Sequence, residues 1–273
     1  VLYRDFPGIQ TIAEEASDWP GITLSADKMG FGFGMKWMMG WMHDMFRYFK
    51  KSPAIRTDVQ DDFTFSLMYF YDEKFMLPLS HDEVVHGKSP MLYKMPGNEW
   101  EQFANLRLLY SWMFTHPGAK LLFMGNEFGQ TSEWNYKSEL DWPLLQYAAH
   151  NKLQECVRTL NYLLRHEPAF YELQFDRKGF EWVSLNYRTE GIMIFKRKGK
   201  LRVNDLLVVL NVSNFPQENM EIQVSGKLHY TEIFNSDAEQ FWGSGKYMNQ
   251  NIFCEVVDKK KKLNVLKLNI PPL

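Results

Sequence analysis

Cysteine is nearly absent from this sequence. Only Cys156 and Cys254 occur among 273 residues, they lie far apart, and neither belongs to a C-x-x-C pair. This scarcity excludes a disulfide framework and a zinc site built from cysteines, and it is typical of proteins kept in a reducing compartment. We therefore expect a cytoplasmic location.

Long apolar runs and a strong net charge are also lacking. No apolar stretch approaches the roughly 20 residues that a membrane-spanning helix requires, so we expect no membrane partner. The 31 basic and 33 acidic side chains leave a net charge of −2. The one basic cluster, Lys259–Lys262, lies between strand-like segments and is expected to form a solvated turn. Nucleic-acid binding is therefore disfavoured.

An initiator methionine and a signal peptide are missing as well. The chain begins with VLYRDFPGIQ, in the middle of a structural element. We therefore expect that the natural N-terminus lies upstream of Val1 and that the sequence is a fragment.

Apolar and aromatic side chains are abundant, at 45% and 16% of the residues, which is enough for a large packed core. Up to residue 170, short apolar runs alternate with helical stretches, while Phe63–Glu73 fits either a helix or a strand. This alternation is typical of βα units with a parallel sheet, and four such units are half of a (β/α)₈ TIM barrel. The expected strands are Gly8–Glu14, Phe31–Trp37, Phe75–Ser80 and Ala119–Gly125, and the expected helices are Trp41–Lys51, Glu99–Thr115 and Asn151–His166.

From about Glu172 the pattern changes to short strands separated by Gly, Asn, Asp and Lys turns. This pattern predicts an all-β sandwich of about 100 residues. We therefore expect two domains: residues 1–170, the half-barrel, and residues 171–273, the all-β domain. The expected strands are FEWVSLNY, GIMIFKRK, LLVVLNVS, MEIQVSG, LHYTEIFN, IFCEVV and LNVLKLNIPPL.

The segment LPLSHDEVVHGK resembles the zinc motif H-E-x-x-H, but its spacing differs. The motif needs two histidines four positions apart on one helical face, whereas His81 and His86 are five apart. Five positions leave two helical side chains roughly 140° apart, so a helix would not direct both rings to one ion. The preceding Phe75–Ser80 is short and apolar and contains a proline, which favours a strand that ends at His81. No metal or organic cofactor is implied.

Polar groups follow all four expected strands of the half-barrel. In a β/α barrel the side chains just past the carboxyl ends of the strands face the active site. Carboxylates that converge there beside an imidazole and aromatic rings suit the cleavage of glycosidic bonds, which needs a carboxylic acid and a second carboxylate. These groups are Glu14 and Glu15, Lys36 and Trp37, His81, Asp82 and Glu83, and Asn126 and Glu127.

Five segments, in this order, carry a resemblance to a known family. TIAEEASDWPGIT, MGFGFGMKWMMGWMHD, FMLPLSHDEVVHGK, LLFMGNEFGQTSEWN and LDWPLL resemble the 1,4-α-glucan (glycogen) branching enzymes of the α-amylase superfamily. The resemblance extends past residue 145 and, less distinctively, through the C-terminal sheet. It implies that residues 1–170 are about the fifth to eighth βα units of the barrel and that a C-terminal all-β domain follows.

The resemblance also implies roles for individual residues. Glu14 matches the general acid/base of the family, and Asp82 matches the carboxylate that stabilises the transition state. His81 matches the imidazole that hydrogen-bonds sugar hydroxyls, while Trp37 and Trp134 are candidates to stack on glucose rings, with core packing as the alternative.

The family's nucleophile, an aspartate on the fourth barrel strand, is expected upstream of Val1. A retaining mechanism cannot form its glycosyl-enzyme intermediate without this group, so we expect the 273 residues to be inactive alone. The leading hypothesis is a cytoplasmic, monomeric enzyme of glycogen biosynthesis that branches α-1,4-glucan. A hydrolase of the same superfamily and a non-catalytic glucan-binding protein remain the alternatives, because the chemistry of the residues alone does not distinguish them.

Overall fold

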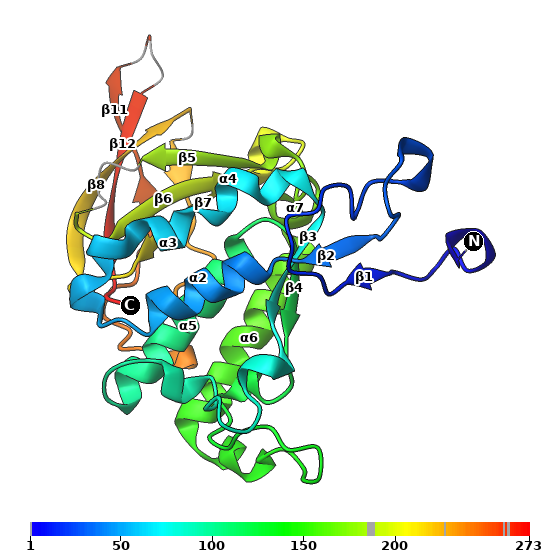
Figure 1. Ribbon diagram of the computed structural model, residues 1–273. Helices are drawn as coiled ribbons and strands as arrows, with labels where there is room; N and C mark the ends of the chain where they lie inside the picture. The colour runs from blue at the N-terminus through cyan, green and yellow to red at the C-terminus, as the bar shows by residue number, and fades with distance from the viewer. Residues whose placement is uncertain (1, 185–188, 227, 259, 261–262) are drawn as a thin grey trace.

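The computed structural model describes residues 2–184, 189–226, 228–258, 260 and 263–273 (Figure 1). The end of the expected strand FEWVSLNY and most of the expected Lys259–Lys262 turn lie outside the described residues.

A parallel sheet forms the N-terminal half of the molecule. Its strands are β1 (Ile12–Ala13), β2 (Met35–Trp37), β3 (Phe75–Leu79) and β4 (Ala119–Leu122), hydrogen-bonded in that order and all parallel. The four expected strands are confirmed, although each is shorter than its apolar run. Because β1 and β4 each have one free edge among the described residues, the sheet is an open half-barrel.

Three long helices cover this sheet. They are α2 (Met39–Phe49), α5 (Glu99–Thr115) and α6 (Ala148–His166), close to the expected bounds. At the start of α5, the Asn98 side chain accepts from the Glu101 amide while the Glu101 carboxylate accepts from the Asn98 amide, which forms a capping box. The shorter helices are α1 (Leu2–Asp5), α3 (Gln60–Thr64), α4 (Ser66–Tyr69) and α7 (Pro168–Tyr171).

The ambiguous segment Phe63–Glu73 is helical over most of its length, in parts of α3 and α4 and a 3₁₀ turn at Phe70–Asp72. Its aromatic residues become core residues: Phe63 stacks on Trp112 of α5 with ring centroids 4.3 Å apart. Long-range packing of this kind decides the conformation of a segment whose local pattern does not.

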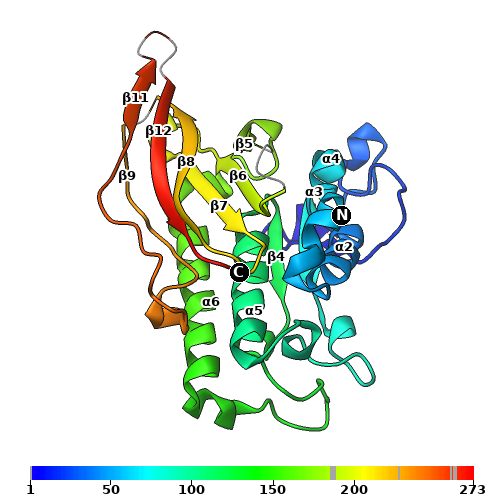
Figure 2. The same cartoon turned by 90° about the vertical axis from the view of Figure 1, so that its left-hand side faces the viewer.

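The C-terminal part contains two three-stranded antiparallel sheets that lie face to face (Figure 2). The predicted all-β domain of sandwich type is confirmed. One sheet has the order β5-β6-β7, the other β11-β12-β8, and a small pair, β10-β9, lies beside them. The strands are β5 (Phe180–Ser184), β6 (Ile192–Arg197), β7 (Leu206–Asn211), β8 (Gln217–Ser225), β9 (His229–Tyr230), β10 (Ile252–Phe253), β11 (Glu255–Asp258) and β12 (Leu263–Ile270).

Strand β6 separates two apolar cores. Met193 and Phe195 point into the large core that α2, α5 and α6 share with β3, whereas Ile192 and Ile194 join a second core with β8 and β12. Alternate residues of a strand face opposite sides, so β6 is buried on both faces. The central sheet therefore packs against helices on one side and against a sheet on the other.

Three buried arginines add polar links between the helices and the C-terminal strands. Arg56 donates to the carbonyl oxygen of Val212, just past β7, and Arg197 of β6 donates to that of Thr115 at the end of α5. Arg107 of α5 donates to the carbonyl oxygen of Ser236 at 2.8 Å. The two halves are thus joined by hydrogen bonds as well as by a common core.

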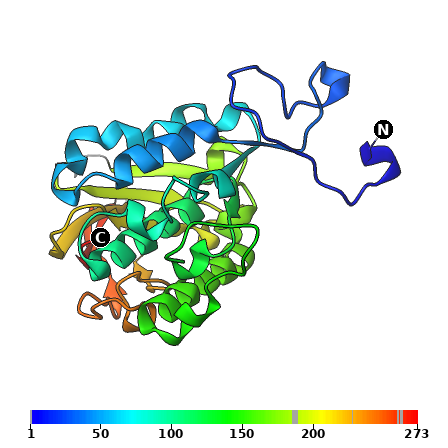
Figure 3. The same cartoon turned by 60° about the horizontal axis from the view of Figure 1, so that its bottom comes forward.

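The segment that carries α1 and β1 extends away from the rest of the molecule (Figure 3). It holds several large exposed apolar side chains, including Phe6, Trp19 and Phe31. Within the described part of the chain, no helix has the length and apolar character needed to cross a bilayer.

Candidate active site

Glu14 and Glu15 directly follow β1, which ends at Ala13. Ala13 pairs in register with Lys36 of β2, so Lys36 lies on the same side of the sheet as Ala13 and Trp37 lies on the other side. Glu14 is exposed, and Trp37 is half-buried.

Lys36 and Glu15 form an ion pair with 2.7 Å between Nζ and Oε2. Lys36 Nζ also donates to the carbonyl oxygen of Ser17 at 2.6 Å, and the Ser17 amide donates back to the Glu15 carboxylate at 2.7 Å. The Lys36 ammonium, followed by Ser17, lowers the pKa of Glu15 to about 2. Glu15 is therefore ionised at neutral pH and is unsuited to donate a proton.

His81 and Asp82 form the first turn after β3. The 3₁₀ turn His81–Glu83 begins two residues past the strand, and His81 Nε2 lies 3.2 Å from Asp82 Oδ1. Their side chains are 42% and 48% exposed, which leaves both groups open to a ligand. The imidazole ring also lies against Phe123, which follows β4, and against Trp134, with centroid distances of 5.8 Å and 6.0 Å.

Glu133 holds the loop that follows His81. Its carboxylate accepts hydrogen bonds from the amides of Gly87 at 3.0 Å and Ser89 at 2.7 Å, and these bonds lower its pKa. His86 Nδ1 lies 3.6 Å from the same carboxylate. Among the described residues there is no group of three or more His, Cys, Asp or Glu side chains arranged to hold a metal ion.

Of the two polar residues after β4, Glu127 is bonded within its own loop, and Asn126 is bonded to α5 through its backbone carbonyl oxygen. Glu127 accepts a hydrogen bond from the Gly125 amide at 2.7 Å, and Tyr110 donates to the carbonyl oxygen of Asn126 at 2.8 Å. The Asn126 side chain is buried. Position at a strand end therefore does not by itself make these two residues part of a binding site.

Of the five residues expected at the site, the structure links His81 with Asp82 and Trp134 by direct contacts. Glu14 and Trp37 lie at the ends of β1 and β2, on the same edge of the sheet. Glu14 follows the strand two places from β3; through Lys36, the register aligns Ala13 with Phe75, four residues before β3 ends at Leu79. The position of Phe123, within the apolar run LLFM, left no sequence signal for its contact with His81.

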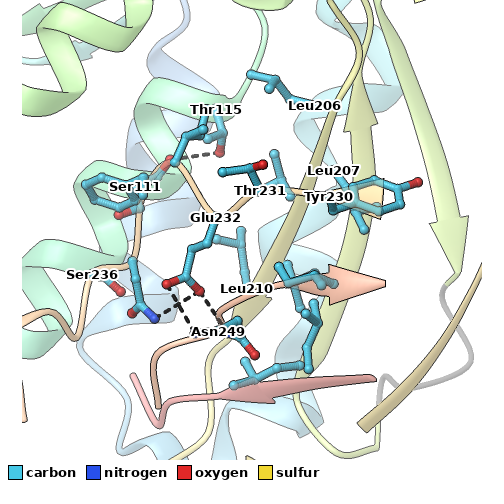
Figure 4. Close-up of a pocket in the computed structure, with 18 of the residues that line it drawn as sticks. Ser111, Thr115, Leu206, Leu207, Leu210, Tyr230, Thr231, Glu232, Ser236 and Asn249 are labelled. Carbon is cyan, nitrogen blue, oxygen red and sulfur yellow. Dashed lines mark hydrogen bonds between the residues drawn. The ribbon is translucent and has the colours of Figure 1, made fainter. Parts of the chain in front are cut away.

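A well-formed cavity lies elsewhere, between α5, β7 and residues 230–236 (Figure 4). It has a volume of about 340 Å³ and leucine-rich walls. Glu232 points into it, but its carboxylate accepts hydrogen bonds from the side chains of Asn249 at 2.8 Å and Asn235 at 3.3 Å. The polar groups of this cavity thus satisfy one another, and the cavity belongs to the interface between the helices and the C-terminal sheets.

Comparison with known proteins gives matches over the whole chain. The family described as "Alpha amylase, C-terminal all-beta domain" matches residues 182–273. The 1,4-alpha-glucan branching enzyme GlgB of Aquifex aeolicus is 45% identical over 276 aligned residues, covering 100% of this chain and 43% of that protein. The enzyme of the same name from Trichormus variabilis is 48% identical, covering 89% of this chain and 32% of that protein. The chain thus spans less than half the length of either relative.

Solved structures agree on the fold. An α-amylase from H. orenii superposes with a TM-score of 0.59 at 19% identity, over 98% of this chain and 53% of that one. An α-amylase from Geobacillus thermoleovorans, complexed with acarbose, gives a TM-score of 0.54 at 12% identity, over 98% of this chain and 55% of that one. In sequence the chain is thus similar over its whole length to part of the 1,4-alpha-glucan branching enzymes, and its C-terminal third matches the all-β domain that follows the barrel of α-amylases.

Proposed function

We propose that the chain is part of an enzyme that cleaves an α-1,4-glucan and transfers the released segment to a 6-hydroxyl, forming an α-1,6 branch. The observation that carries this proposal is the placement of Glu14, His81 and Asp82 at one edge of a parallel sheet, in segments that resemble those of branching enzymes. In a β/α barrel, that edge is where substrates bind.

Each residue has a proposed task in a retaining double displacement. Glu14 protonates the glycosidic oxygen as the bond to the anomeric carbon breaks, and later removes the proton from the attacking 6-hydroxyl. Asp82 stabilises the positive charge that develops on the sugar ring. His81 donates hydrogen bonds to sugar hydroxyls, and the half-buried Trp134 and Trp37 stack on glucose rings.

The covalent intermediate needs a further carboxylate as nucleophile. We propose that this aspartate comes from the barrel strand that precedes β1 in the full-length relatives. This chain covers only 43% of the Aquifex protein, so most of that relative lies outside the aligned part. The glucan segment stays covalently bound to it until the acceptor hydroxyl attacks, so branching requires that this hydroxyl, rather than water, reaches the intermediate.

Further proposals concern the protein as a whole. We propose a division near residues 170 and 171, supported by the end of α7 at Tyr171 and the start of β5 at Phe180. We propose a monomeric cytoplasmic enzyme of glycogen biosynthesis. The absence of a disulfide between Cys156 and Cys254, both of which are free thiols, supports the reducing compartment.

The test uses the complete reading frame that encodes this chain, incubated with amylose. Branching transfer gives many short chains when a debranching enzyme is added later, with few new reducing ends before that. Reducing ends that rise without releasable branches would assign hydrolysis instead, and neither product would leave a glucan-binding protein.

Two variants test the assignment of residues. Glu14→Gln and Asp82→Asn are each expected to lower the rate of branch formation by at least about 10²-fold, because each removes a charge or proton used in the transition state. Glu127→Gln is the matched control, since Glu127 is a carboxylate at the same sheet edge that serves its own loop. Equal effects of all three variants would contradict the assignment.

A further inference from the structure

Lys36 is a buried cation at the sheet edge that the proposed chemistry does not use. Lys36 is only 4% exposed, although it lies on a strand at the rim of an open half-barrel. Burying a charge is costly unless the group is paired and hydrogen-bonded. Lys36 meets this condition with two partners, the Glu15 carboxylate at 2.7 Å and the Ser17 carbonyl oxygen at 2.6 Å.

Both partners belong to the segment that carries Glu14. Strand β1 has two residues, and its ladder with β2 ends at the pair Ala13–Lys36. Beyond that pair, the Lys36 ammonium continues the link between the two strands by binding residues one and three positions after Glu14. The backbone of Glu14 is therefore held on one side by the ladder and on the other by the Lys36 side chain.

We infer that Lys36 is a positioning residue for Glu14, which it fixes at the end of β1 through its contacts with Glu15 and Ser17. This inference rests on the proposed function, in which Glu14 is the acid/base. Lys36 acts through Glu15 and Ser17, the residues one and three positions after Glu14.

The arrangement also distinguishes the two adjacent glutamates. Glu15 has its pKa lowered to about 2, chiefly by the Lys36 ammonium. Glu14 is exposed, and the ion pair of Lys36 is formed with Glu15. The Lys36–Glu15 pair is neutral overall, so it secures the segment without placing a net charge beside the group that must hold a proton.

The first test measures branch formation by the complete protein. Lys36→Met is expected to lower kcat about 10- to 100-fold with little change in KM for amylose, because a small misplacement of a catalytic group affects the chemical step most. Lys36→Arg, which keeps the charge, is expected to restore part of the loss. Lys28→Met is the matched control and is expected to be neutral, since Lys28 is an exposed lysine in the β1–β2 connection. Loss of amylose affinity with unchanged kcat would overturn the inference.

The second test needs no activity and uses the 273-residue chain. Amide hydrogen exchange in Lys36→Met is expected to rise at residues 14–18 while α5 keeps its protection. Unchanged exchange at residues 14–18 would overturn the inference, as would faster exchange throughout the chain, which would show general destabilisation. If the complete wild-type protein forms no branches, only the proposed function is refuted. The exchange result would still decide whether Lys36 holds residues 14–18.

Discussion

Arg56 joins three parts of the chain through buried hydrogen-bond acceptors. Its guanidinium donates to the carbonyl oxygens of Lys51 at 3.2 Å, Phe49 at 3.1 Å and Val212 at 3.4 Å, and to Asn105 Oδ1 at 2.5 Å. The residue is fully buried, and this burial lowers the pKa of its guanidinium to about 10. These contacts connect the end of α2, the middle of α5 and the end of β7.

Replacing Arg56 with methionine keeps most of the apolar stem but leaves these acceptors without their donor. Each buried polar group that loses its partner costs about 1–3 kcal/mol of stability. Removal of the buried guanidinium charge offsets part of the summed cost of these acceptors. We therefore expect Arg56→Met to lower the free energy of unfolding by about 2–4 kcal/mol, because several buried acceptors lose a donor while no buried charge is left unpaired.

Urea unfolding of the chain, followed by tryptophan fluorescence and circular dichroism, measures this change. The matched control is Arg47→Met on α2, because Arg47 is a 57% exposed arginine whose ion pairs with Asp44 and Asp62 lie at the surface. The control is expected to lose no more than about 1 kcal/mol. If Arg56→Met is no more destabilising than Arg47→Met, the reasoning about buried carbonyl acceptors is wrong.

Two further predictions concern the cysteines and a helix end. Cys156 is fully buried, and its pKa is raised to about 12. A thiol reagent at pH 8 is therefore expected to label the half-buried Cys254 first in the folded chain. Labelling is read by mass spectrometry of peptides, and faster labelling of Cys156 would contradict the packing of α6. Asn98→Ala removes the acceptor of the α5 capping box and is expected to lower the free energy of unfolding by about 1 kcal/mol, measured by the same urea titration. Glu101→Gln, which keeps an acceptor at the third helical position, is its control and is expected to cost less.

Local signals were sufficient for most of the elements. Helix α5 has the bounds Glu99–Thr115 that its sequence predicts, because a capping residue precedes it and His116–Pro117 ends it. The four parallel strands were also predicted, because each is an apolar run between turns. The strands are shorter than these apolar runs, and β1 has only two residues. The reason is that a ladder ends where pairing with the neighbouring strand ends, whatever the apolar character of the next residues.

The candidate site was predicted in part. The sequence placed Glu14, His81 and Asp82 after strands, and parallel strands bring such positions to one edge. It did not reveal that Glu127 is used within its own loop or that Phe123 packs against His81. These outcomes depend on side-chain directions, which residue spacing does not specify.

The sequence by itself determined the alternation of strands and helices, the change to an all-β pattern near residue 172 and the residue types at the strand ends, because these follow from short-range periodicity and turn chemistry. Only the tertiary structure decided which glutamate after β1 is paired with Lys36, and that β6 is buried on both faces. The reason is physical: ion pairs, buried carbonyl acceptors and shared cores join residues that lie far apart in the chain, and their partners are set by packing.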